Sequence, residues 1–496
     1  MFPAKLPSLA LGNRYTICKP MEARHTNCAV NRSADRDASV DTIAAISTPP
    51  GRGGIGIVRL SGPRAVAIGE RLVRLRHPLQ HGRARLADVV DEDAGVDAGR
   101  IDEAVVTLFA APHSYTGDDV VEIAAHGSPA VLELLLTRAL ALNARLAQPG
   151  EFTHRAFLSG RLDLTQAEAV RDLIEAQTLT QARQAASQLG GALSRRVLPV
   201  KQSLTELIAL LEAGIDFAED DVEVTPQAEI ARRIEQMTPP LQALEASFTR
   251  GRIVHDGLTL ALVGRPNAGK SSLFNRLLER DRAIVTATPG TTRDTVSERM
   301  SLDGIPLELV DTAGLREAIP ESVDIEEAEQ LGMRRSREAL ADAALVVVVL
   351  DATQALNDEE RELLESMAGR PAVVAINKSD LAPGAKAPAG CGGMPVVATS
   401  ALTGEGIAAL RERILTLATG GAAAEPGMLT NLRQREAIGT ALAALADAGR
   451  ANAQRIPHEM ILLDLYRALW ALDSLTGQTT PDDILHMIFS TFCIGK

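Results

Sequence analysis

The sequence predicts a multidomain α/β and α protein, in which an α/β module interrupts a helical domain that follows an N-terminal α+β domain. The chain has 496 residues, more than a single domain of ~150 residues needs. A glycine-rich loop, Gly264–Ser271, separates a short apolar run from a run with helical spacing, which is typical of a parallel α/β sheet. Helical patterns occupy both sides of this module, at Leu164–Phe248 and after residue 420.

The composition narrows the class of protein. A formal net charge of −13 does not fit a protein that coats nucleic acid, although it is compatible with a local basic patch. The four cysteines are scattered without metal-ligand spacing, which favours a reducing, cytoplasmic setting: Cys18, Cys28, Cys391 and Cys493. No apolar run approaches the ~20 residues of a membrane helix, so we expect no membrane association.

Residues 1–40 show no periodicity, and we interpret them as a disordered extension or a mis-assigned start, with a transit peptide as the alternative. Residues 41–155 predict the α+β domain, because short apolar runs alternate with helical ones. The expected strands are Thr42–Ile46, Ile57–Leu60, Glu103–Phe109 and Asp119–Ala124, and the expected helices are Pro63–Val73 and Pro129–Leu140. Arg59 and Glu122 fall inside strand runs, where they either face solvent or line a polar ligand site.

The sequence predicts helices in residues 156–255 and 420–496. Leu204, Leu207, Ile208 and Leu211 form the stripe of an amphipathic helix, and Pro239-Pro240 is expected to interrupt the pattern. A last helix is expected from Thr480, with Pro481 in its first turn. Since about 75 residues alone make a marginal core, we infer one helical domain interrupted by residues 256–419. Two separate bundles are the alternative.

The inserted module carries the G-x-x-x-x-G-K-[ST] pattern between a strand and a helix. Its glycines let backbone N–H groups face a phosphate, the helix N-terminus adds positive potential, and Lys270 adds a full charge. The hydroxyl of Ser271 is a ligand for Mg²⁺. The pattern therefore predicts a site for a nucleoside triphosphate.

Three further motifs follow in the order of a nucleotide switch. A hydroxyl-rich loop, Thr286–Asp294, supplies Thr292 to complete the Mg²⁺ shell. Asp311 then ends a strand, and Gly314 offers a backbone N–H to the γ-phosphate. Asp380, in Asn377-Lys378-Ser379-Asp380, can accept from guanine N1–H and the 2-amino group, a pair that adenine does not present. The expected GTP contacts are Asn267, Ala268, Gly269, Lys270, Ser271, Ser272, Thr286, Ala287, Thr288, Pro289, Gly290, Thr291, Thr292, Asp311, Thr312, Ala313, Gly314, Asn377, Lys378, Ser379, Asp380, Ser400, Ala401 and Leu402.

Leu315 stands after Asp311-Thr312-Ala313-Gly314, where many small GTPases place a glutamine that orients water. An apolar side chain cannot position the attacking water. Hydrolysis is therefore expected to depend on a rearrangement, on a partner surface or on an additional cation.

Together with the GTPase motifs, four segments resemble the MnmE (TrmE) family of tRNA-modifying GTPases: Thr48–Gly54, Ser114–Gly117, Pro149–Leu158 and Phe492–Lys496. The resemblance runs from Asp41 to Lys496. It implies a Ras-like GTPase domain inserted into the helical domain, and an N-terminal domain that dimerises and binds 5-formyl- or 5,10-methylene-tetrahydrofolate. The implied folate contacts are Arg59, Glu122, Arg161 and Lys496.

The resemblance also implies a K⁺ site built from Asn267, Thr286, Thr288 and Thr291, where the cation promotes hydrolysis as the GTPase domains of a homodimer meet. Glu329 matches the family's water-activating glutamate. Glu326 and Glu327 are alternatives, because an insertion, Ile319–Asp324, precedes them. For Cys493, a catalytic thiol and a small apolar side chain near a helix end both stay open.

The implied function is the installation of an aminomethyl or carboxymethylaminomethyl group at C5 of the wobble uridine of certain tRNAs. The implied partner is the FAD-dependent MnmG, in a heterotetramer or a larger complex, and folate supplies the one-carbon unit. The alternative is a ribosome-assembly or regulatory GTPase that acts only as an RNA-binding switch. The GTPase domain alone does not distinguish this class from the tRNA-modifying class.

Overall fold

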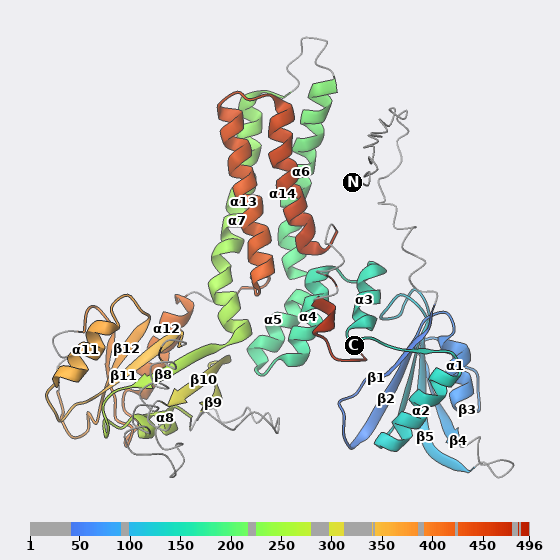
Figure 1. The fold of residues 1–496 in the computed structure, drawn as a ribbon, viewed down its shortest axis with the longest axis horizontal. Helices are drawn as coiled ribbons and strands as arrows, with labels where there is room; N and C mark the ends of the chain where they lie inside the picture. The colour runs from blue at the N-terminus through green and yellow to red at the C-terminus, as the bar shows by residue number, and fades with distance from the viewer. Residues whose placement is uncertain are drawn as a thin grey trace, which may run out of the picture.

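The structure, a computed structural model, describes residues 41–90, 99–216, 225–278, 297–311, 340, 343–384, 391–421, 425–478, 485 and 488–495. Figure 1 shows three parts: a sheet domain, a tall helical bundle and a second sheet domain, whose segment of the chain lies between the two halves of the bundle. Residues 1–40 and the expected helix start at Thr480 lie outside the described ranges.

The first domain is built on a seven-stranded sheet of order β3-β4-β5-β6-β2-β1-β7. Its strands are β1 (Ile43–Ile46), β2 (Gly53–Ser61), β3 (Arg74–Leu75), β4 (Ala84–Val90), β5 (Arg100–Phe109), β6 (Val120–Gly127) and β7 (Arg145–Leu146). Helices α1 (Ala65–Leu72) and α2 (Pro129–Ala141) bury one face, where Val58, Leu60 and Ile123 lie in the core. Because side chains alternate along a strand, Arg59 lies on the opposite face.

That opposite face carries exposed apolar side chains. Leu86 of β4 is 50% exposed and stands in register with Val105 of β5, which is 42% exposed. Ile101, four residues before Val105 on the same strand, is 41% exposed. The two faces of the sheet therefore differ. Helices α1 and α2 cover one face, whereas on the other face Phe152, in the helix Glu151–Leu158, packs with Ile43 and Ala45 of β1 and leaves the side chains of β4 and β5 exposed.

The helical part contains α3 (Glu151–Leu158), α4 (Leu164–Glu175), α5 (Leu179–Leu189), α6 (Ala192–Asp216), α7 (Gln227–Asp256), α13 (Leu432–Ala453) and α14 (His458–Thr476). Helices α6, α7, α13 and α14 stand side by side in Figure 1 and share one apolar core. Leu207 and Leu241, from before the insertion, lie in that core with Ile438 and Leu465, from after it. The prediction of a single interrupted helical domain is confirmed, and two separate bundles are excluded.

One expectation about this domain is wrong. Pro239 and Pro240 do not interrupt the helical pattern, since α7 runs through them from Gln227 to Asp256. Each proline removes one main-chain hydrogen bond of the helix. Burial of Met237, Leu241 and Leu244 in the shared core offsets this cost, because tertiary packing rather than propensity stabilises most helices in proteins.

The inserted domain is a six-stranded sheet of order β13-β12-β11-β8-β10-β9. Its strands are β8 (Leu258–Val263), β9 (Ser297–Leu302), β10 (Ile305–Asp311), β11 (Leu345–Asp351), β12 (Ala372–Asn377) and β13 (Val396–Ala398), with helices α8 (Lys270–Leu278), α11 (Asp358–Ser366) and α12 (Ile407–Thr419). All neighbouring strands are parallel except β9 and β10. The carboxyl ends of the parallel strands therefore meet at one edge, where ligands bind in open α/β sheets.

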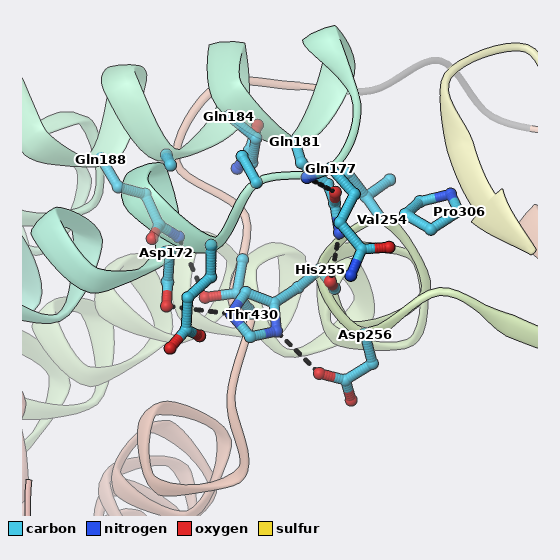
Figure 2. A pocket seen from close by; sticks show the side chains of 13 residues that line it. Asp172, Gln177, Gln181, Gln184, Gln188, Val254, His255, Asp256, Pro306 and Thr430 are labelled. Carbon is cyan, nitrogen blue, oxygen red and sulfur yellow. Dashed lines mark hydrogen bonds and ion pairs between the residues drawn. The ribbon is translucent and has the colours of Figure 1, made fainter. Parts of the chain in front are cut away.

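The helical domain meets the inserted domain where α7 passes into β8. His255, in the last turn of α7, lies between two carboxylates: Nε2 is 3.0 Å from Asp172 Oδ1 and Nδ1 is 2.7 Å from Asp256 Oδ1. Gln181 Nε2 donates to the His255 carbonyl at 2.6 Å, and Thr178 Oγ1 donates to the Gly304 carbonyl in the β9–β10 turn at 2.6 Å. Asp172, Gln181, His255 and Asp256 line a cavity with a volume of about 250 Å³. Figure 2 shows the side chains around it.

His255 makes the stability of this junction depend on pH. The hydrogen bond with Asp172 raises the pKa of His255, and the charges of Asp172 and Asp256 raise it further. Burial lowers this pKa, but by less, so that it moves from 6.5 to about 9. A group whose pKa is higher in the folded state stabilises that state fully below its unfolded pKa, and this stabilisation is lost as the pH rises through the folded pKa. We expect His255→Gln to lower the free energy of unfolding by about 1–3 kcal/mol at pH 6, and by much less at pH 9.5.

Urea unfolding of the wild type and the variant at both pH values measures this difference. The exposed His77 gives the matched control, His77→Gln, which should leave the stability unchanged. An equal loss of stability at pH 6 and pH 9.5 would contradict the assignment of the charge to His255.

No helix within the described ranges combines the length and the apolar character needed to span a membrane.

Candidate functional site

The phosphate-loop residues lie between the end of β8 and the start of α8. Gly264 has a φ of +151°, and a Cβ there would stand 2.2 Å from the Val349 carbonyl oxygen, so only glycine fits this approach to β11. Lys270 is 7% exposed, and its Nζ donates to the carbonyls of Gly264 at 2.8 Å and Arg265 at 2.9 Å. The loop thus wraps around the Lys270 ammonium, the arrangement expected of a loop that binds an anionic group.

Asn377 joins this loop to the segment that was predicted to recognise the base. It is 2% exposed, its Nδ2 donates to the Ala268 carbonyl at 3.0 Å, and its Oδ1 accepts from the Ala401 N–H at 3.1 Å. A Cβ on Gly269 would lie 2.3 Å from Asn377 Nδ2, so a glycine is needed there as well. The structure therefore brings together three segments that are far apart in the sequence: Ala268–Gly269, Asn377 and Ala401.

Lys378 is held by a residue that sequence reasoning missed. Its Nζ lies 2.8 Å from Oδ2 of Asp351, which ends β11 and is 4% exposed. Burial raises the pKa of the Asp351 carboxyl, but hydrogen bonds from Lys378 and Thr353 outweigh it and hold the pKa at about 2. Asp351 keeps its negative charge and fixes the Lys378 stem. The available signal was its position at the carboxyl end of an apolar strand, the edge where the other site residues lie.

The other residues of these two segments lie nearby along the chain. Ser271 and Ser272 are in the first turn of α8, Ser379 N–H donates to the Thr399 carbonyl at 3.1 Å, and Asp380 is half-buried. Ser400 is buried, whereas Leu402 is 81% exposed.

Several predicted site residues lie outside the described ranges, so their roles stay predictions. Asp311 ends β10, and only its backbone is described. The remaining ones are Thr286, Ala287, Thr288, Pro289, Gly290, Thr291, Thr292, Thr312, Ala313, Gly314, Leu315, Glu326, Glu327, Glu329 and Lys496.

A second polar site lies on the face of the first sheet opposite α1 and α2. Arg59 and Glu122 are cross-strand partners on β2 and β6, with Arg59 Nε 2.9 Å and Nη2 2.8 Å from Glu122 Oε1. Arg59 Nη1 donates to the carbonyl of Gly495, 436 residues along the chain, at 3.2 Å. The guanidinium lies 5.9 Å from the Tyr115 ring centroid and 5.5 Å from that of Phe152. The site therefore combines a charged pair with two aromatic rings.

The C-terminal segment reaches this site by pairing with the first domain. Ile494 forms an antiparallel bridge with Pro149, and the Cys493 carbonyl accepts from Gly150 N–H at 3.4 Å. Cys493 itself is exposed, and its catalytic role stays a prediction. Arg161 contacts a different group, since its Nη1 donates to the Pro112 carbonyl at 2.9 Å in the loop that carries Tyr115.

Comparisons with known proteins bear on what these two sites do. A family model described as the MnmE helical domain matches residues 164–493, and one described as the GTP-binding protein TrmE N-terminus matches residues 42–161. The tRNA modification GTPase MnmE of Koribacter versatilis (strain Ellin345) is 57% identical over 461 residues, which cover 92% of this chain and 99% of that protein. The chain belongs to the MnmE family. The tRNA modification GTPase MnmE of Chloroflexus aurantiacus (strain ATCC 29366 / DSM 635 / J-10-fl) is 45% identical over 469 residues, 92% of this chain and 100% of that protein.

Membership of the MnmE family confirms the resemblance and the fold class predicted from the sequence. The chain is a GTP-hydrolysing enzyme of tRNA modification, and GTP and Mg²⁺ binding follow from that activity. Among solved structures, the G domain of the T. maritima FeoB iron transporter is 30% identical and covers 32% of this chain and 98% of its own, with a TM-score of 0.23. A TM-score this low supports no conclusion about the present chain.

Proposed function

We propose that this enzyme, with the FAD-dependent MnmG, installs an aminomethyl or carboxymethylaminomethyl group at C5 of the wobble uridine of tRNA. A tetrahydrofolate supplies the one-carbon unit, and GTP hydrolysis drives the conformational cycle. The observation that carries the proposal is the contact of Arg59 with both Glu122 and Gly495. This contact brings the C-terminal segment to the sheet of the first domain.

The side chains of that site suit the chemistry of a folate. A pterin is a flat heterocycle with hydrogen-bond donors along one edge. The Glu122 carboxylate is an acceptor for such donors, and Tyr115 and Phe152 supply apolar surface. Arg59 holds the Glu122 carboxylate, and Lys496 follows Gly495 directly. When bound, the folate supplies a one-carbon group. The residues bind and orient it, with Arg161 as a further contact.

The test is calorimetric titration of the chain with 5-formyltetrahydrofolate. We expect the wild type to bind. Arg59→Ala and Glu122→Gln should each weaken the affinity by about 10- to 100-fold, the range for hydrogen bonds to charged groups. Deletion of Lys496 should abolish binding. Arg100→Ala removes an exposed arginine from β5 and is the matched control. Absence of binding by the intact chain would refute the folate proposal.

In the GTPase domain we propose that Lys270 and the surrounding loop bind the phosphates and that Asp380 binds guanine. Mg²⁺ is held by Ser271 and Thr292, with Asp311 acting through water, and Glu329 orients the attacking water. Asn267, together with Thr286, Thr288 and Thr291, holds K⁺. Asn267 has a φ of +65°, a left-handed backbone conformation that asparagine tolerates better than most residues.

The K⁺ proposal predicts faster GTP hydrolysis in KCl than in NaCl at equal ionic strength. Equal rates in the two salts would remove the cation from the mechanism.

We propose that the chain acts as a homodimer and binds MnmG in a heterotetramer or larger complex. The exposed Leu86, Ile101 and Val105, on β4 and β5 of the sheet face opposite α1 and α2, support a subunit contact there, because burial of such an apolar surface is favourable. The domain assignment that accompanies the proposal is 41–155 for folate binding and dimerisation, 156–255 and 420–496 for the helical domain, and 256–419 for the GTPase domain. The reaction takes place in the cytoplasm.

A further inference from the structure

A basic segment on the first domain is not used by either site. Residues 71–85 contain five arginines and two histidines but no aspartate or glutamate, in a chain whose formal net charge is −13. We name the part of this segment around the β3–β4 turn the basic edge and define it by Arg76, His77, His81, Arg83 and Arg85. The basic edge is therefore positively charged, whereas the chain as a whole is negatively charged.

The fold places the basic edge at the rim of the first domain. Strand β3 is the terminal strand of the seven-stranded sheet, and Figure 1 shows β3 and β4 on the side of that domain away from the helical bundle. Arg76, His77, His81 and Arg83 are exposed, and Arg85 is partly exposed. Gln80 pairs with Arg83 across the turn and accepts from Arg85 Nη2 at 2.9 Å.

The arginines of the basic edge are not neutralised within the described structure. Arg76, Arg83 and Arg85 form no ion pair with any carboxylate of the described residues, whereas Arg100 on the neighbouring strand pairs with Asp88 and Glu103. Three guanidinium groups at one rim therefore produce a local positive potential. Guanidinium groups bind phosphate through two parallel N–H donors, which makes arginine the preferred side chain for nucleic-acid backbones.

His81 links the basic edge to the candidate folate site. Its Nδ1 accepts from the Ala110 N–H at 2.9 Å, so the ring proton resides on Nε2, where it can be donated to a phosphate oxygen. The ring centroid of His81 is 6.3 Å from that of His113. The same loop continues to Tyr115, whose ring lies beside Arg59. A polyanion bound at the basic edge is thus one short loop away from the Arg59–Glu122 pair.

The acidic residues of this loop do not cancel the charge of the edge. Asp119 Oδ1 accepts from the Ala111 N–H at 2.8 Å, and Asp118 Oδ2 lies 4.0 Å from Arg155. Neither carboxylate forms an ion pair with an arginine of the basic edge among the described residues.

We propose that the basic edge binds the phosphate backbone of the tRNA substrate and guides the nucleotide to be modified towards Arg59 and Glu122. The inference rests on the proposed function, because it takes the Arg59–Glu122 site as the place of one-carbon transfer. Contacts of this kind are insensitive to base sequence and weaken with salt, because bound cations are released from the RNA. The competing explanation is that the charges only keep another β-strand from pairing with β3.

The experiment measures binding of the full chain to tRNA by fluorescence anisotropy over a range of KCl concentrations. We expect the double variant Arg76→Glu/Arg83→Glu to bind at least 10-fold more weakly, and the slope of log Kd against log salt to fall by roughly 0.7–0.9 for each phosphate that the variant no longer neutralises. Arg413→Glu, an exposed arginine on α12 of the GTPase domain, is the matched control. GTP hydrolysis and 5-formyltetrahydrofolate binding by the double variant should equal those of the wild type.

Three results would overturn the proposal: a wild-type chain that does not bind tRNA, a double variant with unchanged affinity and salt slope, or a double variant whose main change is a different oligomeric state. The third result would support the strand-blocking explanation. The conservative variant Arg76→Gln/Arg83→Gln guards against misfolding caused by charge reversal and should show a smaller loss in the same direction. RNA binding through the edge without folate binding by the wild type would refute only the proposed function.

Discussion

Lys270→Ala is expected to reduce GTP hydrolysis by at least about 100-fold, the lower end of the effect of removing one hydrogen-bond donor that stabilises charge developing in a transition state. The Lys270 ammonium is buried, and the carbonyls of Gly264 and Arg265 hold it against the loop. A triphosphate in the loop binds this charge directly, and no other lysine or arginine lies between Gly264 and Ser272 except Arg265. Both nucleotide affinity and the rate of hydrolysis should therefore fall. Phosphate release and binding of a fluorescent GTP analogue measure the two quantities.

The variant Lys270→Met keeps the apolar stem and separates the loss of charge from the loss of packing. Both variants should keep the wild-type unfolding midpoint within a few degrees, and Arg413→Ala on α12 should hydrolyse GTP normally. Hydrolysis by Lys270→Met at the wild-type rate would show that phosphates bind elsewhere in the chain.

Asp380→Asn is expected to change which base the enzyme accepts. The carboxylate offers two acceptor oxygens to guanine N1–H and the 2-amino group, whereas the asparagine amide offers one acceptor and one donor. The donor then faces the 2-amino group, and GTP affinity should fall by roughly 100-fold or more. Xanthosine triphosphate carries a carbonyl at C2 and should bind better to the variant than to the wild type. Competition between the two nucleotides for the site measures the reversal.

Asp358→Asn changes an exposed aspartate at the start of α11 and is the matched control for the base-specificity change. The arrangement around Asn377 supports this expectation, because its contacts with Ala268 and Ala401 join the phosphate loop to the base-binding segments. An unchanged ratio of GTP to xanthosine triphosphate affinity in Asp380→Asn would place guanine recognition on other residues.

The elements predicted correctly from the sequence are those with long or strongly apolar patterns. The helix expected at Pro129–Leu140 is α2, which runs from Pro129 to Ala141, because its apolar residues recur at helical spacing over three turns. Strands β3 and β4 were missed. Strand β3 has only two residues, and arginines on an edge strand weaken the apolar alternation that would reveal it.

The contacts that build the two sites could be predicted only in part. The motifs of the GTPase domain lie at strand ends, so the topology of a parallel sheet brings them together. No local pattern indicates that Arg59 meets Gly495, because the two residues are 436 positions apart and the contact depends on how the C-terminal segment crosses Pro149. The strand pattern left Arg59 and Glu122 either facing solvent or lining a polar ligand site, and the resemblance to a family favoured the ligand site. Asp351 was missed because a single carboxylate after an apolar run has no distinctive pattern.

The interruption of the helical domain has a consequence for biosynthesis. Helices α6 and α7 emerge from the ribosome well before α13, since roughly 175 residues separate Asp256 from Leu432. At 5–20 residues per second, the apolar faces that carry Leu207 and Leu241 wait about 10–35 s for their partners. During this interval the nascent chain presents a hydrophobic surface to chaperones and to other nascent chains. The order of synthesis therefore makes completion of the bundle a late event, after the inserted domain has left the exit tunnel.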